Sequence, residues 1–143
     1  MSQINKTTQR TILVAGDLIT LALVTLFGFA THGEAGTAGL RMLTTFAPLT
    51  IAWFFVAPFF GVYESRRTAD YRQLWRPFWA MIVAGPMAAW LRSVVLGIVN
   101  NNGLNTPILP IFVVVLGGFA ALAVLAWRLI AAVFLRRMSR THE

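Results

Sequence analysis

Four long runs of apolar residues, separated by short polar segments, dominate the chain. They cover residues 11–31, 42–63, 78–99 and 108–135. Each is long enough for a helix that crosses the hydrocarbon core of a bilayer, which takes about twenty apolar residues. The pattern therefore predicts an all-α fold: a single integral membrane domain over residues 1–143, with four transmembrane helices in an up-down bundle.

Polar connectors and prolines mark the ends of these runs. The connectors are residues 31–39, 64–76 and 100–106. Prolines stand where the third and fourth helices are predicted to begin, at Pro77, Pro107 and Pro110. A first helical turn suits proline, because the missing N–H would have no partner there. Three more prolines fall inside predicted helices, where each removes a backbone hydrogen bond: Pro48, Pro58 and Pro86.

Basic residues alternate between rich and poor segments along the chain. The rich segments are the N-terminal tail, the second connector and the C-terminal tail, with Lys6, Arg10, Arg66, Arg67, Arg72, Arg76, Arg136, Arg137 and Arg140. Arg41 alone stands at the far edge of the first connector, and the third connector has no basic residue. The positive-inside rule then predicts that both termini are cytoplasmic. Four aromatic residues are expected at the same face as an interfacial belt: Tyr63, Tyr71, Trp75 and Trp79.

Composition agrees with a membrane location. The chain is 57% hydrophobic and only 12% charged, about half the charge of a typical soluble domain, and its mean hydropathy is +0.69. The net charge of +7 is explained by cytoplasmic anchors facing anionic lipid, so no nucleic-acid partner is expected. A cleaved signal peptide is the alternative for the first run, but about twenty apolar residues that include Asp17 exceed a signal core.

The chemistry-bearing residues are few. Cysteine is absent, and the two histidines, His32 and His142, stand far apart in the sequence. Thiol catalysis and cysteine-ligated metal sites are therefore excluded, and no set of three zinc ligands is apparent. We expect no catalytic residue, no metal and no cofactor, and hence a protein that is not an enzyme.

Three charged residues lie inside the predicted spans, where charges are costly and usually find a partner. Asp17 shares a helical face with Thr20, Val24, Gly28 and Thr31, while Arg92 aligns with Gly85 and Ala89, and Arg128 with Gly117, Ala121 and Ala131. Such small residues allow close helix contacts. Asp17 and Arg128 lie at similar depths below the basic tails, about 10 and 12 Å at 1.5 Å per residue, which predicts an ion pair between the first and fourth helices.

Arg92 is expected near the opposite membrane face. Its candidate partners there are Glu34, the His32 ring and carbonyl groups of the first connector. Together, Asp17, Arg128, Arg92 and His32 form the candidate intramembrane polar site.

The order of several short motifs resembles the domain-of-unknown-function 3054 family of small prokaryotic four-helix membrane proteins. The motifs are Gly16-Asp17, His32-Gly33, PFFGVY at residues 58–63, PMAAWLR at residues 86–92 and Trp127-Arg128. The resemblance spans nearly the whole chain. It implies a multi-pass protein of the prokaryotic cytoplasmic membrane, and it brings no reaction and no catalytic residues.

Two functions remain open on these grounds. The first is a non-enzymatic structural, accessory or lipid-interacting bundle with an intramembrane ion pair. Its partners would be membrane lipids, and also a second copy or another membrane protein. The alternative is a small carrier, proton-coupled or for an anionic substrate, that uses Asp17, Arg92 and Arg128. An enzyme acting within the membrane would need paired acids or a metal motif, and one intramembrane aspartate does not supply either.

Overall fold

The computed structural model describes residues 6–31, 39–64, 71–101, 108 and 110–140. Its helices are α1 (Lys6–Thr31), α2 (Gly39–Val56), the 3-10 helices η1 (Ala57–Phe60) and η2 (Tyr71–Gln73), α3 (Trp75–Val99) and α4 (Pro110–Arg140). Four helical segments are long and apolar enough to cross a membrane: Lys6–Thr31, Arg41–Phe60, Trp75–Val99 and Pro110–Leu135. The four predicted spans are therefore found as helices, in the predicted order.

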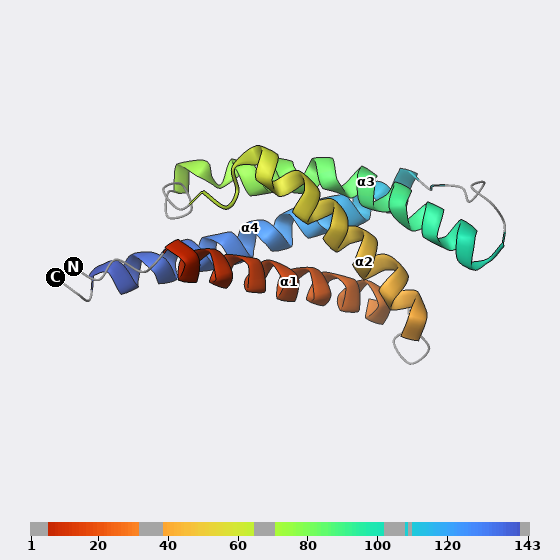
Figure 1. The fold of residues 1–143 in the computed structure, drawn as a ribbon, viewed down its shortest axis with the longest axis horizontal. Helices are drawn as coiled ribbons and strands as arrows, with labels where there is room; N and C mark the ends of the chain where they lie inside the picture. Colours follow the sequence, from red (N-terminus) through yellow and green to blue (C-terminus); the bar gives the residue numbers. More distant parts are fainter. Residues whose placement is uncertain (1–5, 32–38, 65–70, 102–107, 109, 141–143) are drawn as a thin grey trace.

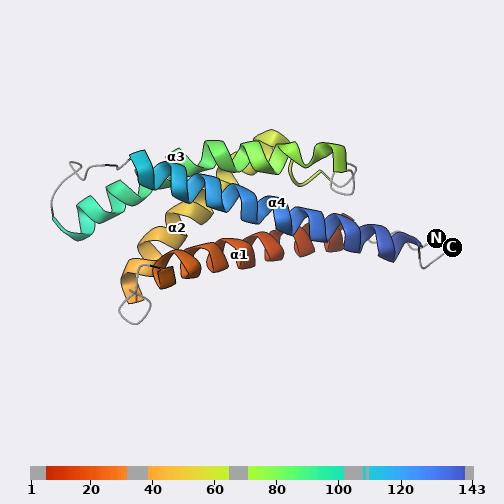
Figure 2. The same cartoon turned by 180° about the vertical axis from the view of Figure 1, so that it is seen from behind.

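The bundle is built as two outer helices joined by two crossing ones. α1 and α3 lie on opposite sides, α2 crosses between them on one face, and α4 passes along the other face (Figures 1 and 2). α3 makes the most extensive contacts, with α2 and with α4, while α1 packs less extensively on the same two helices. The first turns of α1 and the last turns of α4 lie at one end of the bundle (Figure 1).

The second span differs most from its expected form. It was predicted as one helix over residues 42–63, but the α-helix ends at Val56 and continues as the 3-10 helix η1. Pro58 therefore lies in η1 and not inside an α-helix, whereas Pro48 and Pro86 do lie inside α2 and α3. The change of helix type is consistent with Pro58, because proline cannot donate the hydrogen bond that would continue the α-helix.

Many of the buried residues are small, and many large apolar residues are exposed. Alanines recur in the buried core: Ala52, Ala57, Ala80, Ala84, Ala88, Ala89, Ala120, Ala121, Ala131 and Ala132. Large apolar side chains such as Ile19, Phe59 and Ile98 are exposed instead. Small residues let helix backbones approach closely.

The backbones of α3 and α4 approach each other closely at two glycines. A Cβ built on Gly85 would lie 2.8 Å from the Cα of Gly117. Ala89 and Ala121, further along the same faces, are also buried. The predicted small-residue faces of α3 and α4 are therefore confirmed as a helix contact. On α1 the predicted face is only partly buried, because Val24 is buried but Gly28 and Thr31 are exposed.

Candidate functional site

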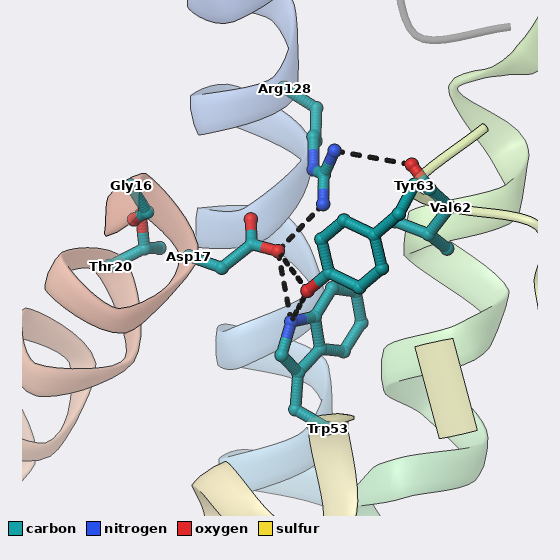
Figure 3. A network of polar contacts seen from close by, with 7 residues as sticks. All are labelled: Gly16, Asp17, Thr20, Trp53, Val62, Tyr63 and Arg128. Carbon is teal, nitrogen blue, oxygen red and sulfur yellow. Dashed lines mark hydrogen bonds and ion pairs between the residues drawn. The ribbon is translucent and has the colours of Figure 1, made fainter. Parts of the chain in front are cut away.

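The polar core of the bundle is organised around a single carboxylate oxygen (Figure 3). Oδ2 of Asp17, on α1, accepts a hydrogen bond from Nη2 of Arg128 on α4 at 2.6 Å, and these groups form an ion pair. It also accepts hydrogen bonds from the Tyr63 hydroxyl at 2.6 Å and from Nε1 of Trp53 at 3.0 Å. We call these four residues the Asp17 network. Three donors on one oxygen form the environment of an ionised carboxylate.

The ion pair of this network is buried, so its contacts affect how the helices pack. The residues Asp17 and Arg128 are 0% and 4% exposed. Nη1 of Arg128 also donates to the backbone carbonyl of Val62 at 3.3 Å, and its guanidinium carbon lies 5.1 Å from the centre of the Tyr63 ring. One side chain of α4 is thus tied to α1 and to the segment that follows η1. Because a buried charge without a partner is very costly, these contacts hold the elements in one arrangement.

Tyr63 reaches the network because the chain turns sharply after η1. The turn is made by Gly61, whose φ of 63° lies in the left-handed region that glycine adopts without strain. Its N–H donates to the carbonyl of Pro58 at 2.9 Å, and the N–H of Val62 donates to that of Ala57 at 3.2 Å. The PFFGVY motif is therefore a helix stop and a turn that places the Val62 carbonyl and the Tyr63 hydroxyl beside α1 and α4.

An arginine secures the same turn from α3. Nη1 of Arg76 donates to the carbonyl of Phe60, the last residue of η1, at 3.0 Å, and its Nε donates to Oε1 of Gln73 at 2.6 Å. A backbone carbonyl at a helix end has no partner within the helix, so the guanidinium satisfies it. Arg76, which the sequence suggested as a cytoplasmic anchor, therefore also fixes the segment that carries Tyr63.

Two pairs of neighbouring residues, one on α1 and one on α4, pack against each other where these helices meet. Asp17 faces Arg128, and Gly16 faces the neighbouring Trp127. A Cβ built on Gly16 would lie only 1.8 Å from the Cζ2 atom of the Trp127 ring. The indole of Trp127 therefore occupies the space that a side chain at position 16 would need. The motifs Gly16-Asp17 and Trp127-Arg128 together form one interface between α1 and α4.

Some buried polar atoms of this interface have no hydrogen-bond partner within the part of the chain that the structure describes. They are Oδ1 of Asp17, Nε of Arg128 and Nε1 of Trp127. The carboxylate is therefore bonded through one oxygen alone. This oxygen already accepts three donors and is paired with the Arg128 guanidinium.

The predicted ion pair between Asp17 and Arg128 is confirmed, but two further members of the network were not foreseen. Tyr63 was expected in an interfacial aromatic belt, and the structure shows that its hydroxyl points into the bundle and donates to Asp17 (Figure 3). Trp53 was not singled out, since it stands in an apolar run like any core residue, yet it is fully buried. Trp75 and Trp79, the tryptophans of the same predicted belt, are 50% and 51% exposed.

Arg92 lies apart from the Asp17 network, in the other half of the bundle. Its Nε donates to Oγ1 of Thr45, on α2, at 3.0 Å. Its guanidinium carbon lies 4.8 Å from the centre of the Phe112 ring, on α4. Two of its predicted partners, Glu34 and His32, lie outside the described residues. The structure thus separates the predicted polar site into the Asp17 network and the surroundings of Arg92.

Comparison with known proteins gives one match. A family model described as "Protein of unknown function (DUF3054)" matches residues 14–131. The matched range includes Asp17, Arg92 and Arg128. No curated protein and no solved structure matches the chain.

Proposed function

Because the chain belongs to the DUF3054 family, whose description assigns no activity, we propose a function from its own residues: a non-enzymatic integral membrane protein. It acts as a structural or accessory four-helix bundle in contact with lipid. The observation that carries the proposal is the convergence of three donors on Oδ2 of Asp17. The network gives the carboxylate a structural role.

The surface supports insertion into a membrane. Large apolar side chains are exposed along all four long helices, and such a surface would promote aggregation in water. The basic ends of α1 and α4 share one end of the bundle (Figure 1). By the positive-inside rule this end faces the cytoplasm, in the cytoplasmic membrane of a prokaryote.

The orientation can be tested with single cysteines, because the chain has none of its own. A membrane-impermeant thiol reagent applied to intact cells is expected to label Asn100→Cys and to leave Ser65→Cys unlabelled. Asn100 has a φ of −91° and suits cysteine, whereas the neighbouring Asn101 has a φ of 54°. Permeabilised cells provide the control, since both variants should then react. Labelling of Ser65→Cys in intact cells would reverse the proposed orientation.

The alternative is a small carrier, proton-coupled or for an anionic substrate, and its proton-coupled form requires an acid that is free to exchange its proton. In the Asp17 network the acid is instead paired with Arg128, and the same cation disfavours a cationic substrate. A carrier would have to break three hydrogen bonds in each cycle. Hydrogen bonds to charged groups each contribute about 1.5–3 kcal/mol, so the network favours the structural role.

Tyr63→Phe tests the structural role with the smallest change. It removes only the hydroxyl, and we expect the free energy of unfolding in mild detergent to fall by about 1.5–3 kcal/mol, the contribution of a hydrogen bond to a charged group. Trp79→Phe is a control, because Trp79 is half-exposed and its replacement should leave the melting temperature nearly unchanged. A Tyr63→Phe protein as stable as the parent would contradict the structural proposal.

A further inference from the structure

A cleft opens between α1 and α4, in the half of the bundle opposite the Asp17 network. Its volume is about 600 Å³, within the range of small-molecule sites. We call it the Arg92 cleft. Its apolar lining comes mainly from the second half of α1 and the first half of α4: Val24, Phe27, Phe29, Phe112, Val115, Leu116 and Phe119. Among the lining residues that the structure describes, Arg92 alone is charged.

The divergence of α1 from α4 creates this cleft. Near the termini the two helices are joined by the Asp17–Arg128 pair, and towards the other end they separate (Figure 2). α2 and α3 each contribute one lining residue, Thr45 and Arg92. Exposed residues such as Val115 and Phe119 line it, so in the proposed membrane the cleft is open to lipid.

Two contacts orient the Arg92 guanidinium and leave most of its N–H donors available to an anion. Thr45 accepts the hydrogen bond from its Nε, and the Phe112 ring lies beside its guanidinium carbon. These two contacts fix the group in place. A guanidinium has five N–H donors, and the described residues accept only the one on Nε. The remaining donors, on Nη1 and Nη2, have the fork geometry that binds carboxylate or phosphate oxygens in pairs.

Charge and shape together select the ligand. The guanidinium of Arg92 brings a positive charge to the cleft. A cation would therefore be repelled, and an anion attracted. A small soluble anion would leave the phenylalanine walls without a partner. An anionic amphiphile suits both the Arg92 cation and the apolar walls, because its head carries the negative charge and its chain is apolar.

We propose that the Arg92 cleft binds a membrane lipid whose phosphate headgroup carries a net negative charge. The headgroup oxygens accept hydrogen bonds from Nη1 and Nη2 of Arg92, and an acyl chain lies along Phe27 and Phe119. The inference deepens the lipid contact of the proposed function and rests on insertion of the bundle in a membrane. It does not depend on the role of the Asp17 network.

The test compares two lipids that share their acyl chains, phosphatidylglycerol and phosphatidylcholine. Purified protein in mild detergent is titrated with each lipid, and the bound molecules are counted by native mass spectrometry. The parent is expected to prefer phosphatidylglycerol. Arg92→Gln should weaken phosphatidylglycerol binding by about 10- to 100-fold, the effect of losing hydrogen bonds to a charged group. Phosphatidylcholine has the same phosphate but no net charge because of its choline cation, so its binding should be weaker in the parent and should change less in Arg92→Gln.

Two further variants keep the test decisive if Arg92→Gln folds poorly. Val115→Trp places bulk in the cleft from an exposed position and should weaken phosphatidylglycerol binding while leaving Arg92 intact. Arg10→Gln is the matched control, because this exposed arginine of α1 lies at the other end of the bundle, and it should preserve the preference.

Three outcomes would overturn the proposal: equal binding of both lipids by the parent, a preference that persists in both Arg92→Gln and Val115→Trp, or displacement of the lipid by millimolar inorganic phosphate. The last would identify the site as one for a soluble anion. Failure of this proposal can be told apart from failure of the structural proposal. The structural proposal is tested by the stability of the Asp17 network variants without added lipid, whereas this one is tested by lipid binding.

Discussion

Asp17→Asn and Arg128→Gln are each expected to lower the free energy of unfolding by about 3–5 kcal/mol, the cost of stranding one charge of a buried pair. The pair is fully formed at 2.6 Å, and neither residue is more than 4% exposed. Removing Arg128 leaves a buried carboxylate held only by Tyr63 and Trp53. Removing the charge of Asp17 leaves a buried guanidinium whose remaining hydrogen bond is to the Val62 carbonyl.

The double variant separates the structural role from the carrier. With both charges removed, no charge is stranded, so the double variant should recover part of the combined loss. Melting curves or denaturant titrations of the parent, both single variants and the double variant in one detergent give the coupling energy. Strictly additive losses, or an Asp17→Asn protein as stable as the parent, would refute the structural pair and favour a carboxylate used for proton exchange.

Gly16→Ala should produce the second large loss of stability, about 3 kcal/mol, at the upper end of the usual cost of overpacking. The added methyl group would lie 1.8 Å from the Trp127 ring. The indole is rigid and precedes Arg128 in the chain, so its displacement also disturbs the ion pair. Thermal unfolding in detergent, followed by circular dichroism, measures the effect.

Gly28→Ala is the matched control on the same helix. A Cβ there meets nothing within 4 Å. Alanine also has a higher helix propensity than glycine, by up to about 1 kcal/mol, so this variant should be neutral or slightly more stable. If both alanine variants unfolded like the parent, the packing of Trp127 on Gly16 would not be the close contact described above.

The sequence by itself determined the four helices and the main ion pair. Apolar runs of about twenty residues leave the backbone few alternatives in lipid, because every backbone polar group must be satisfied within the helix. The ion pair was also predictable, since Asp17 and Arg128 are opposite charges at similar depth and each stands beside small residues. Likewise, Gly85 and Gly117 indicated a close contact, because residue size alone limits how near two helices can come.

Only the tertiary structure decided which neutral side chains complete the Asp17 network and where Arg92 points. Trp53 stands in an apolar run, and no local pattern shows that its N–H meets an acid 36 positions away. Tyr63 was expected at the interface, because a pattern read as one continuous helix does not reveal the turn at Gly61.

The partners of Arg92 depend equally on helix crossing. Thr45 and Phe112 come from α2 and α4, and their distances from Arg92 are set by how these helices cross α3. The Arg92 cleft arises because α1 and α4 diverge. The residue pattern of either helix alone does not show how the two helices lie relative to each other. Helix formation is local and follows from residue type, whereas these contacts join segments far apart in the chain and exist only once the helices have packed.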